Sequence, residues 1–363
     1  MKYTATIGEH HARPLLDLIF SKKGLEGAAY LLCGVSTTDT ETRLLVRDVV
    51  PVRDDEYLVR EPLRLSIDSS SYARVAKLAN AMKASVIFVH SHPEGIADFS
   101  EQDDREEPKL MTFFGERTPG RVHGSLVVSG PESMQGRVWV DGRWVSLDRV
   151  RLLGRRYRFL DQSEGTQAPW FDRQVEAFGA ELQALLQSLH VGVVGCGGTG
   201  SAVAEQLCRL GVGKLSLFDG DALEKSNVTR VYGSEVADAG KNKAVVLGKR
   251  LSGIGLGTEV KVFGEFISVQ AVAKNLRDCD VVFGCTDAQA PRGLLVKLAL
   301  RHLIPVFDVG VKITSSERTI TDITGRVTEL FPGNACLFCR ERITAERIAF
   351  EQLSPDEKAT RVR

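Results

Sequence analysis

The sequence lacks the features that would mark a membrane or secreted protein. It has no apolar run of about 18 residues, the length that crosses a bilayer as a helix, and its first residues (MKYTATIGEHHARP) lack the apolar core of a signal peptide. Its net charge is zero, with 47 basic and 47 acidic side chains, so no overall field favours nucleic acid or an acidic lipid surface. These absences predict a protein without a membrane or nucleic-acid partner.

Cysteine is scarce and scattered. The chain has seven cysteines, an odd number without the spacing of a disulfide framework, which favours reduced thiols and a cytoplasmic location. Internal repeats and low-complexity tracts are also lacking. The 363 residues, of which 43% are hydrophobic and 26% are charged, suffice for two or three ordinary globular domains.

A glycine-rich turn organises the second half of the chain. Residues 191–194 are typical of a buried parallel strand, residues 201–210 have helical periodicity, and residues 215–218 form a second strand followed by Asp219. This order predicts a nucleotide-binding βαβ unit, with phosphates at the helix N-terminus and Asp219 at the ribose. Between the first strand and the helix, Gly195, Gly197 and Gly200 have the spacing G-x-G-x-x-G, and Gly198 is added.

The residues after this unit favour ATP over NAD as the ligand. Asn227, Arg230 and Lys243 follow the second strand, and two cations can neutralise the charge that develops at the phosphates of a triphosphate. Asp287 follows the apolar strand at 280–283, where a carboxylate would face the ligand crevice and could hold Mg²⁺. A structural glycine turn without a ligand is the alternative.

Residues from about 170 to the end resemble the ThiF/MoeB-type activating enzymes, relatives of the ubiquitin-activating enzymes. The resemblance lies in GCGGTGS (195–201), DGDALEKSNVTR (219–230), Lys243, CTDA (285–288) and FDRQV (171–175), although Trp170-Phe171 replaces an Arg-Tyr pair. It implies adenylation of the C-terminal glycine of a ubiquitin-like protein by a homodimer. The implied roles are ribose binding by Asp219, phosphate contacts by Asn227, Arg230 and Lys243, Mg²⁺ binding by Asp287, and insertion of Arg173 into the partner subunit's site.

A second candidate site lies in the first half of the chain. Residues 85–89 form a strand that delivers His90 and His92, which share one face because they are two residues apart. Ser100 and Asp103 then open a helical segment, where a helix N-cap with an acid in the first turn is the ordinary interpretation. Two histidines and an aspartate are also the ligands of a catalytic zinc that keeps a fourth position for water.

The spacing of these residues resembles the signature of the JAMM (JAB/MPN) metalloproteases. Seven residues separate His92 from Ser100 and two separate Ser100 from Asp103, and the resemblance covers about residues 1–150. It implies that His90, His92 and Asp103 bind Zn²⁺ and that the Ser100 hydroxyl stabilises the oxyanion. Glu26, just before the apolar run at 27–35, would be the general base, although a solvated end residue is the alternative.

The patterns around these sites predict two α/β domains. The polar stretch DQSEGTQAP at 161–169 predicts a linker between a metalloprotease domain at 1–160 and an adenylyltransferase domain at 170–363. The basic stretch at 149–159 is interpreted as an edge strand with a solvated face rather than a nucleic-acid patch. After the linker, a helix at 171–189 and alternating strands and helices predict a Rossmann-like, doubly wound parallel sheet.

A single C-x-x-C motif, Cys336 and Cys339, lies near the end of the chain. The pair suggests half of a structural zinc site and resembles the first half of the zinc knuckle of the activating enzymes. No cysteine follows Cys339, and the sequence stops where those enzymes usually continue. The second zinc site is therefore expected to be absent, shared, or completed by a missing C-terminal segment, and no nucleophilic cysteine can be nominated.

The two resemblances together predict a bifunctional enzyme. One domain would hydrolyse the peptide or isopeptide bond after the C-terminal glycine of a ubiquitin-like protein, and the other would adenylate that glycine with ATP and Mg²⁺. A conjugating enzyme would be a further partner. The alternatives are sulfur-carrier activation for cofactor or cysteine synthesis, and a non-catalytic adaptor that only binds a ubiquitin-like protein.

Overall fold

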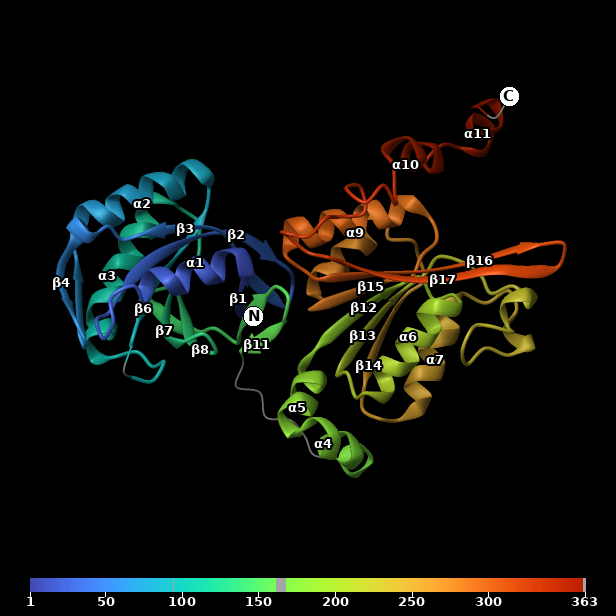
Figure 1. The fold of residues 1–363 in the computed structure, drawn as a ribbon, viewed down its shortest axis with the longest axis horizontal. Helices are drawn as coiled ribbons and strands as arrows, with labels where there is room; N and C mark the ends of the chain where they lie inside the picture. The colour runs from blue at the N-terminus through green and yellow to red at the C-terminus, as the bar shows by residue number, and fades with distance from the viewer. Residues whose placement is uncertain (94, 161–167, 362–363) are drawn as a thin grey trace. The chain divides into compact units, whose positions relative to one another are not determined.

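The computed structural model describes residues 1–93, 95–160 and 168–361. The chain divides into two compact units, Met1–Gln162 and Ser163–Arg363, each with its own sheet (Figure 1). Residues 161–167 of the predicted linker lie outside the described residues. Within the described part of the chain, no helix is both long enough and apolar enough to cross a membrane.

The N-terminal unit is built on a nine-stranded mixed sheet with the order β11-β10-β1-β3-β2-β6-β7-β8-β9. These strands are β1 (Lys2–Gly8), β2 (Ala28–Thr37), β3 (Glu41–Pro51), β6 (Ser85–Ser91), β7 (His123–Gly130), β8 (Ser133–Val140), β9 (Arg143–Ser146), β10 (Arg149–Leu153) and β11 (Arg158–Leu160). A separate antiparallel pair consists of β4 (Tyr57–Glu61) and β5 (Arg64–Ile67). The helices are α1 (Glu9–Ile19), α2 (Ser69–Met82) and α3 (Glu101–Arg117).

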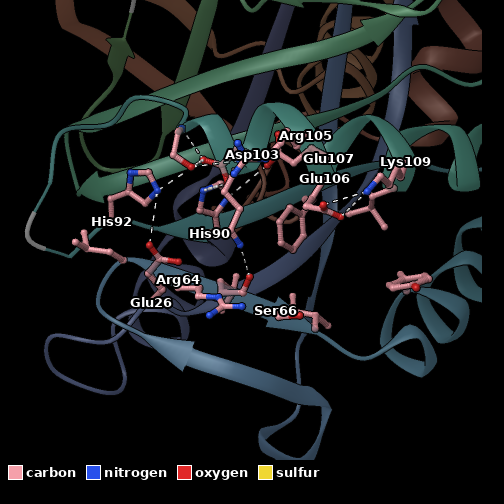
Figure 2. Close-up of a pocket in the computed structure, with 18 of the residues that line it drawn as sticks. Glu26, Arg64, Ser66, His90, His92, Asp103, Arg105, Glu106, Glu107 and Lys109 are labelled. Carbon is pink, nitrogen blue, oxygen red and sulfur yellow. Dashed lines mark hydrogen bonds and ion pairs between the residues drawn. The ribbon is translucent and has the colours of Figure 1, made fainter.

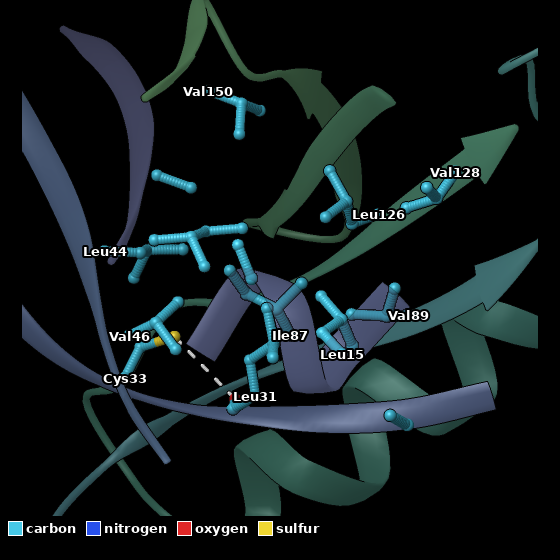
Figure 3. Close-up of a cluster of buried hydrophobic side chains, with 14 of the residues drawn as sticks. Leu15, Leu31, Cys33, Leu44, Val46, Ile87, Val89, Leu126, Val128 and Val150 are labelled. Carbon is cyan, nitrogen blue, oxygen red and sulfur yellow. Dashed lines mark hydrogen bonds between the residues drawn. The ribbon is translucent and has the colours of Figure 1, made fainter. Parts of the chain in front are cut away.

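Alternation along β2 gives this sheet two buried faces. Leu31 and Cys33 pack with Leu15 of α1 on one face (Figure 3). Tyr30 and Leu32 point the other way and pack against α2 and α3. Because both faces are covered, the central strands are nearly continuous apolar runs, and a polar side chain on them needs a specific partner.

Most of the basic stretch at 149–159 does not form the solvated edge strand that we predicted, although its last residues begin the edge strand β11. β10 lies inside the sheet between β1 and β11, and Arg151 is buried. Its Nη2 lies 3.0 Å from Oε1 of Glu41 on β3, while Nη2 of Arg43 lies 2.7 Å from the other carboxylate oxygen. The prediction was wrong because the carboxylate that compensates the buried cation comes from a strand far away in the sequence.

The C-terminal unit has a six-stranded sheet with the order β14-β13-β12-β15-β16-β17. All neighbours are parallel except β17, which runs antiparallel to β16. The strands are β12 (His190–Val194), β13 (Lys214–Phe218), β14 (Glu259–Phe263), β15 (Val281–Gly284), β16 (Val306–Ser316) and β17 (Thr319–Leu330). From β12 the chain continues to β13 and β14 on one side of β12, and it later returns to the other side of β12 to form β15. The predicted doubly wound sheet is therefore confirmed, and the strand order reverses at β12.

Helices connect the parallel strands of this sheet. They are α6 (Gly198–Arg209), α7 (Lys243–Ile254), α8 (Gln270–Ala273) and α9 (Gln289–His302); α4 (Asp172–Phe178) and α5 (Ala180–Ser188) precede the sheet, and α10 (Ala345–Glu351) and α11 (Pro355–Arg361) follow it. The single helix predicted at 171–189 is broken at Gly179. Its φ of 89° lies in the region that favours glycine, so the helix axis cannot continue through it.

Candidate metal centre and nucleotide-binding site

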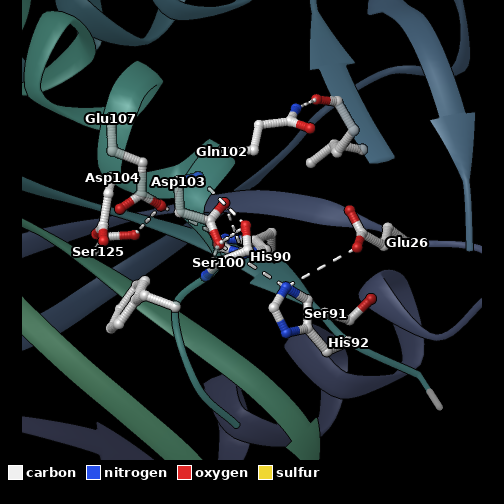
Figure 4. A network of polar contacts seen from close by, with 12 residues as sticks. Glu26, His90, Ser91, His92, Ser100, Gln102, Asp103, Asp104, Glu107 and Ser125 are labelled. Atoms are coloured by element: carbon white, nitrogen blue, oxygen red, sulfur yellow. Dashed lines mark hydrogen bonds and ion pairs between the residues drawn. The ribbon is translucent and has the colours of Figure 1, made fainter. Parts of the chain in front are cut away.

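Strand β6 brings both predicted histidines to the end of the central sheet. His90 lies in register with Ala28 of β2 and Val127 of β7, and it is 1% exposed. His92 follows the strand, and its backbone N–H donates to the carbonyl of Val128 at 2.9 Å. The extended backbone keeps both rings on one side, with centroids 5.0 Å apart (Figure 4).

Helix α3 brings the third predicted ligand, Asp103, to these histidines. The hydroxyl of Ser100, the N-cap residue, accepts the backbone N–H of Asp103 at 3.3 Å. In return, Oδ2 of Asp103 accepts the N–H and the hydroxyl of Ser100, both at 2.7 Å. The helix-cap interpretation of this pair is confirmed. The same bonds orient the carboxylate, whose Oδ1 lies 3.3 Å from Nε2 of His90.

The three side chains meet closely enough to hold one metal ion. One ligand atom each of His90, His92 and Asp103 lies within 4.8 Å of the others, and Nε2 of His92 is 3.9 Å from Oδ2 of Asp103. Both ring nitrogens of His90 are buried without a hydrogen bond among the described residues, and buried nitrogens normally have a partner. Two imidazoles and one carboxylate are the donor set of a catalytic zinc with an open fourth position, so the residues fit that metal.

Glu26 faces this centre from just before β2. Its Oε1 lies 3.8 Å from Nε2 of His92 (Figure 4). Its backbone is fixed on both sides, because its N–H donates to the Glu61 carbonyl at 3.1 Å and its carbonyl accepts Nε–H of Arg60 at 2.8 Å. Burial raises the pKa of Glu26 to about 7, although the charge of His90 lowers it. Glu26 is therefore a buried neighbour of His92 and not the solvated end residue that the sequence left open as the alternative.

Burial and charge favour the deprotonated form of two of the candidate ligands. Burial raises the pKa of Asp103, but the close approach and charge of His90, together with the bonds from Ser100, hold it well below its usual range. Burial lowers the pKa of His92, and the charge of His90 lowers it further. At neutral pH these residues are a carboxylate and a neutral imidazole, which are the forms that bind metal.

A pocket of about 750 Å³ opens beside the metal centre (Figure 2). Glu26 and the three candidate ligands line it, together with residues of β5 and α3. Gln102 joins these two walls, because its Nε2 donates to the carbonyl of Leu65 at 3.0 Å. β4 and β5 were not predicted, because their short runs of mixed polar and apolar residues carry little periodicity.

Glu107 is a further polar residue at this site that the sequence analysis missed. Its Oε1 lies 3.6 Å from Nδ1 of His90, on the ring edge that does not face Asp103. The available signal was its spacing, because Glu107 follows Asp103 by four residues and therefore lies on the same face of a predicted helix.

The glycine-rich turn has a backbone geometry that side chains would prevent. Gly195 has a φ of 90°, and a Cβ there would lie 2.8 Å from the carbonyl oxygen of Cys285. A Cβ at Gly200 would lie 1.7 Å from the carbonyl oxygen of Gly195. A Cβ at Gly197 would meet no described atom within 4 Å, which leaves that side of the turn open to a ligand. The turn therefore combines tight packing with an open approach to the N-terminus of α6.

Asp219 holds this turn from the end of β13. Its Oδ2 accepts the backbone N–H of Cys196 at 2.6 Å, and its Oδ1 accepts that of Asp221 at 2.8 Å. The carboxylate therefore ties the glycine turn to the loop after β13. This role is structural and is separate from the ribose contact that we predicted for it.

The predicted phosphate-binding residues lie in the segment between β13 and the start of α7. A Cβ at Gly198 would lie 3.3 Å from Cδ of Arg230, so this arginine passes over the start of α6. Lys243 begins α7, and its Nζ lies 3.0 Å from Oδ2 of Asp221. Asn227 is buried, and its Oδ1 accepts the N–H of Glu224 at 3.2 Å.

The last predicted nucleotide residues are exposed. Asp287 lies just after Cys285, whose backbone is against Gly195. Its carboxylate is thus on the loop that adjoins the glycine turn. Arg173 is exposed in the first turn of α4, and its role in a partner subunit stays a prediction.

The C-x-x-C cysteines lie together after β17. Their Sγ atoms are 3.6 Å apart. Among the described residues, no third potential ligand lies close enough to Cys336 and Cys339 to form a metal-binding cluster with them. The pair therefore offers two of the four ligands that a structural zinc needs.

Several known proteins are similar to part of this chain. The tRNA threonylcarbamoyladenosine dehydratase of Escherichia coli is 28% identical over 163 residues, which are 42% of this chain and 61% of the relative. The adenylyltransferase and sulfurtransferase uba4 of Aspergillus niger is 28% identical over 187 residues, or 51% of this chain and 38% of the relative. The chain thus spans less than two thirds of the length of these relatives.

Part of the chain also matches a solved structure, with a TM-score of 0.36 and 27% identity. That structure is the E. coli tRNA N6-threonylcarbamoyladenosine dehydratase in complex with ATP. The match covers 41% of this chain and 66% of that one. Family models match both units: prokaryotic homologs of the JAB domain match residues 9–141, and the ThiF family matches residues 171–360. The chain belongs to the ThiF family and carries a JAB-type domain before its ThiF domain.

Proposed function

We propose that the chain processes and activates a ubiquitin-like or sulfur-carrier protein that ends in glycine. The N-terminal unit hydrolyses the peptide or isopeptide bond after that glycine, and the C-terminal unit adenylates the free carboxylate with ATP. The observation that supports this most directly is the convergence of His90, His92 and Asp103 beside Glu26, in one chain with a ThiF-family glycine turn.

For hydrolysis, His90, His92 and Asp103 would hold a zinc ion, which when bound supplies a Lewis acid and lowers the pKa of water to about 7. Glu26 accepts a proton from the attacking water and returns it to the leaving amine. Ser100 lines the same pocket. The Ser100 hydroxyl donates to Asp103. To stabilise the oxyanion, it must give up this hydrogen bond and donate to the oxyanion instead.

For adenylation, the open side of the glycine turn receives the phosphates of ATP at the N-terminus of α6. Arg230 and Lys243 neutralise charge on the phosphates, Asp287 holds Mg²⁺, and Asp219 contacts the ribose. The glycine carboxylate of the partner attacks the α-phosphorus, a new C–O–P linkage forms, and pyrophosphate leaves. In a homodimer, Arg173 contributes to the partner subunit's site.

Two other functions fit the same family. One is sulfur-carrier activation for cofactor or cysteine synthesis, which the name of the Aspergillus relative supports. The other is a non-catalytic adaptor. A relative is named as a tRNA dehydratase, so family membership alone does not decide the substrate. Burial of Arg149 and Arg151 removes two of the five arginines of residues 149–159 from the surface that they would offer to nucleic acid.

Isotope exchange tests the adenylation half. Full-length protein, mixed with ATP, Mg²⁺ and a panel of ubiquitin-fold proteins ending in Gly-Gly, should exchange labelled pyrophosphate into ATP, because adenylation is reversible. Asp287→Ala should abolish exchange through loss of the metal. Glu346→Ala is the matched control, because Glu346 is an exposed acid on α10 outside the nucleotide site.

Binding measurements separate the outcomes. ATP should bind in the presence of Mg²⁺, and NAD should not. ATP binding without exchange for any member of the panel would favour the adaptor. Binding of NAD but not ATP would overturn the proposed chemistry of the C-terminal unit.

A further inference from the structure

The ring of His90 lies between two carboxylates of α3. Oδ1 of Asp103 is 3.3 Å from Nε2, and Oε1 of Glu107 is 3.6 Å from Nδ1. Residues four apart share one face of a helix, so a single helix supplies both groups. Nε2 of His90 faces Asp103 and the metal centre, whereas Nδ1 faces the carboxylate of Glu107.

Glu107 is held firmly in this position. It is 4% exposed, and the hydroxyl of Ser125 on β7 donates to its Oε1 at 2.5 Å. Arg137 on β8 donates to its Oε2 through Nε at 3.2 Å and Nη2 at 2.6 Å. The guanidinium is itself placed against the rings of Phe99 and Trp144, at 3.7 and 4.1 Å. Two strands of the sheet therefore fix the carboxylate that faces His90.

We infer that Glu107 is a positioning residue that selects the metal-binding tautomer of His90. A neutral imidazole carries its proton on one of two nitrogens, and an ionised carboxylate can only accept a hydrogen bond. A proton on Nδ1 therefore faces an acceptor and leaves the lone pair of Nε2 for the metal. At 3.6 Å the two groups face each other without a formed hydrogen bond. The inference rests on the proposed zinc centre.

The orientation of Arg137 makes Glu107→Gln an informative change. Because Arg137 donates twice to the Oε2 position, the amide oxygen of a glutamine would take that position. The amide NH₂ would then take the Oε1 position and point a donor at Nδ1 of His90. A donor there favours the tautomer with its proton on Nε2, which leaves Nε2 without a lone pair for the metal. The near-isosteric Glu107→Gln should therefore lose as much zinc affinity as Glu107→Ala.

Zinc affinity and the stability of the metal-free protein test this role. Full-length variants are prepared with Cys336→Ser and Cys339→Ser, so that the cysteine pair contributes no zinc binding. Zinc affinity is measured by competition with a chromophoric chelator, and thermal unfolding is followed without metal. The matched control is Asp104→Asn, because Asp104 also pairs with Arg137 at 2.5 Å but is exposed and is not paired with His90.

We expect Glu107→Gln and Glu107→Ala to weaken zinc binding by about 10- to 100-fold, and Asp104→Asn to change it by less than about twofold. The metal-free Glu107→Gln protein should unfold close to the temperature of the Asp104→Asn protein. Equal zinc affinity in the parent and in Glu107→Gln, or an equal loss in Asp104→Asn, would refute the positioning role. A parent that binds no zinc would refute the proposed metal centre itself and this inference with it.

Discussion

Single residues at both sites serve the fold and the proposed chemistry together. Ser100 and Asp103 cap α3, and the same bonds turn the Asp103 carboxylate towards His90. Asp219 binds two backbone N–H groups while it lies where a ribose is expected. A residue that stabilises a helix end or a turn can therefore also bind a metal or a ligand. For this reason, experiments on such residues must distinguish a loss of activity from a loss of structure.

Glu26 allows such a separation. Glu26→Gln preserves the size of the side chain and its place beside His92 but cannot accept a proton. The variant should retain zinc and lose cleavage by about 100-fold or more, the usual contribution of a positioned general base. The assay measures zinc content and cleavage of a ubiquitin-like protein fused through its terminal glycine to a reporter.

The control for this change is Glu61→Gln. Glu61 is exposed, and its backbone carbonyl accepts the N–H of Glu26, so the substitution leaves that contact in place. Its activity should match the parent. Normal cleavage by Glu26→Gln would mean that another residue takes the proton.

At the scale of elements, local patterns predicted the units with strong periodicity but missed two hairpins, β4–β5 and β16–β17, whose strands are adjacent in sequence. The β12-turn-α6-β13 unit and the strand that delivers His90 and His92 follow from periodicity, glycine spacing and the two-residue strand repeat. Other features depend on distant partners. β10 is buried because Glu41 on β3 compensates Arg151. Glu26 reaches the metal centre because β2 pairs with β6.

The buried ion pair of β3 and β10 should make acid stability of the N-terminal unit depend on Glu41. Burial raises the pKa of Glu41, but Arg151 and Arg43 outweigh this effect and lower it to about 2 from 4.5. Because the folded-state pKa is lowered, the stabilisation is present above about pH 4.5 and is lost as the pH falls towards about 2. Glu41→Gln should cost about 3 kcal/mol at pH 7, since it leaves buried cations without their carboxylate.

Urea unfolding at pH 7 and pH 3 measures this effect. Fluorescence in a Trp170→Phe background reports Trp139 and Trp144, both in the N-terminal unit. The difference between parent and Glu41→Gln should shrink at pH 3. Glu132→Gln, which removes an exposed pair with Arg158, should change stability by less than about 1 kcal/mol. A difference that is the same at both pH values would contradict the role of Glu41 ionisation.

At the scale of the whole molecule, two compact units, each with hydrophobic core residues of its own, carry two separate sites. The metal centre uses only residues of Met1–Gln162, and the glycine turn uses only residues of Ser163–Arg363. In the proposed function, the glycine terminus of a common partner links the two reactions, because cleavage produces the carboxylate that adenylation consumes. Each site can therefore be inactivated without loss of the other.

The proposed homodimer gives the last prediction. If Arg173 acts in the partner subunit's site, an Arg173→Ala protomer and an Asp287→Ala protomer together form one intact site and one doubly defective site. Each variant alone should show no pyrophosphate exchange. A randomly reassorted equal mixture should recover about a quarter of parental activity, because about half of the dimers are mixed and each has one working site of two. Absence of recovery in a mixture shown to contain mixed dimers would place Arg173 in its own subunit's site or in a purely structural role.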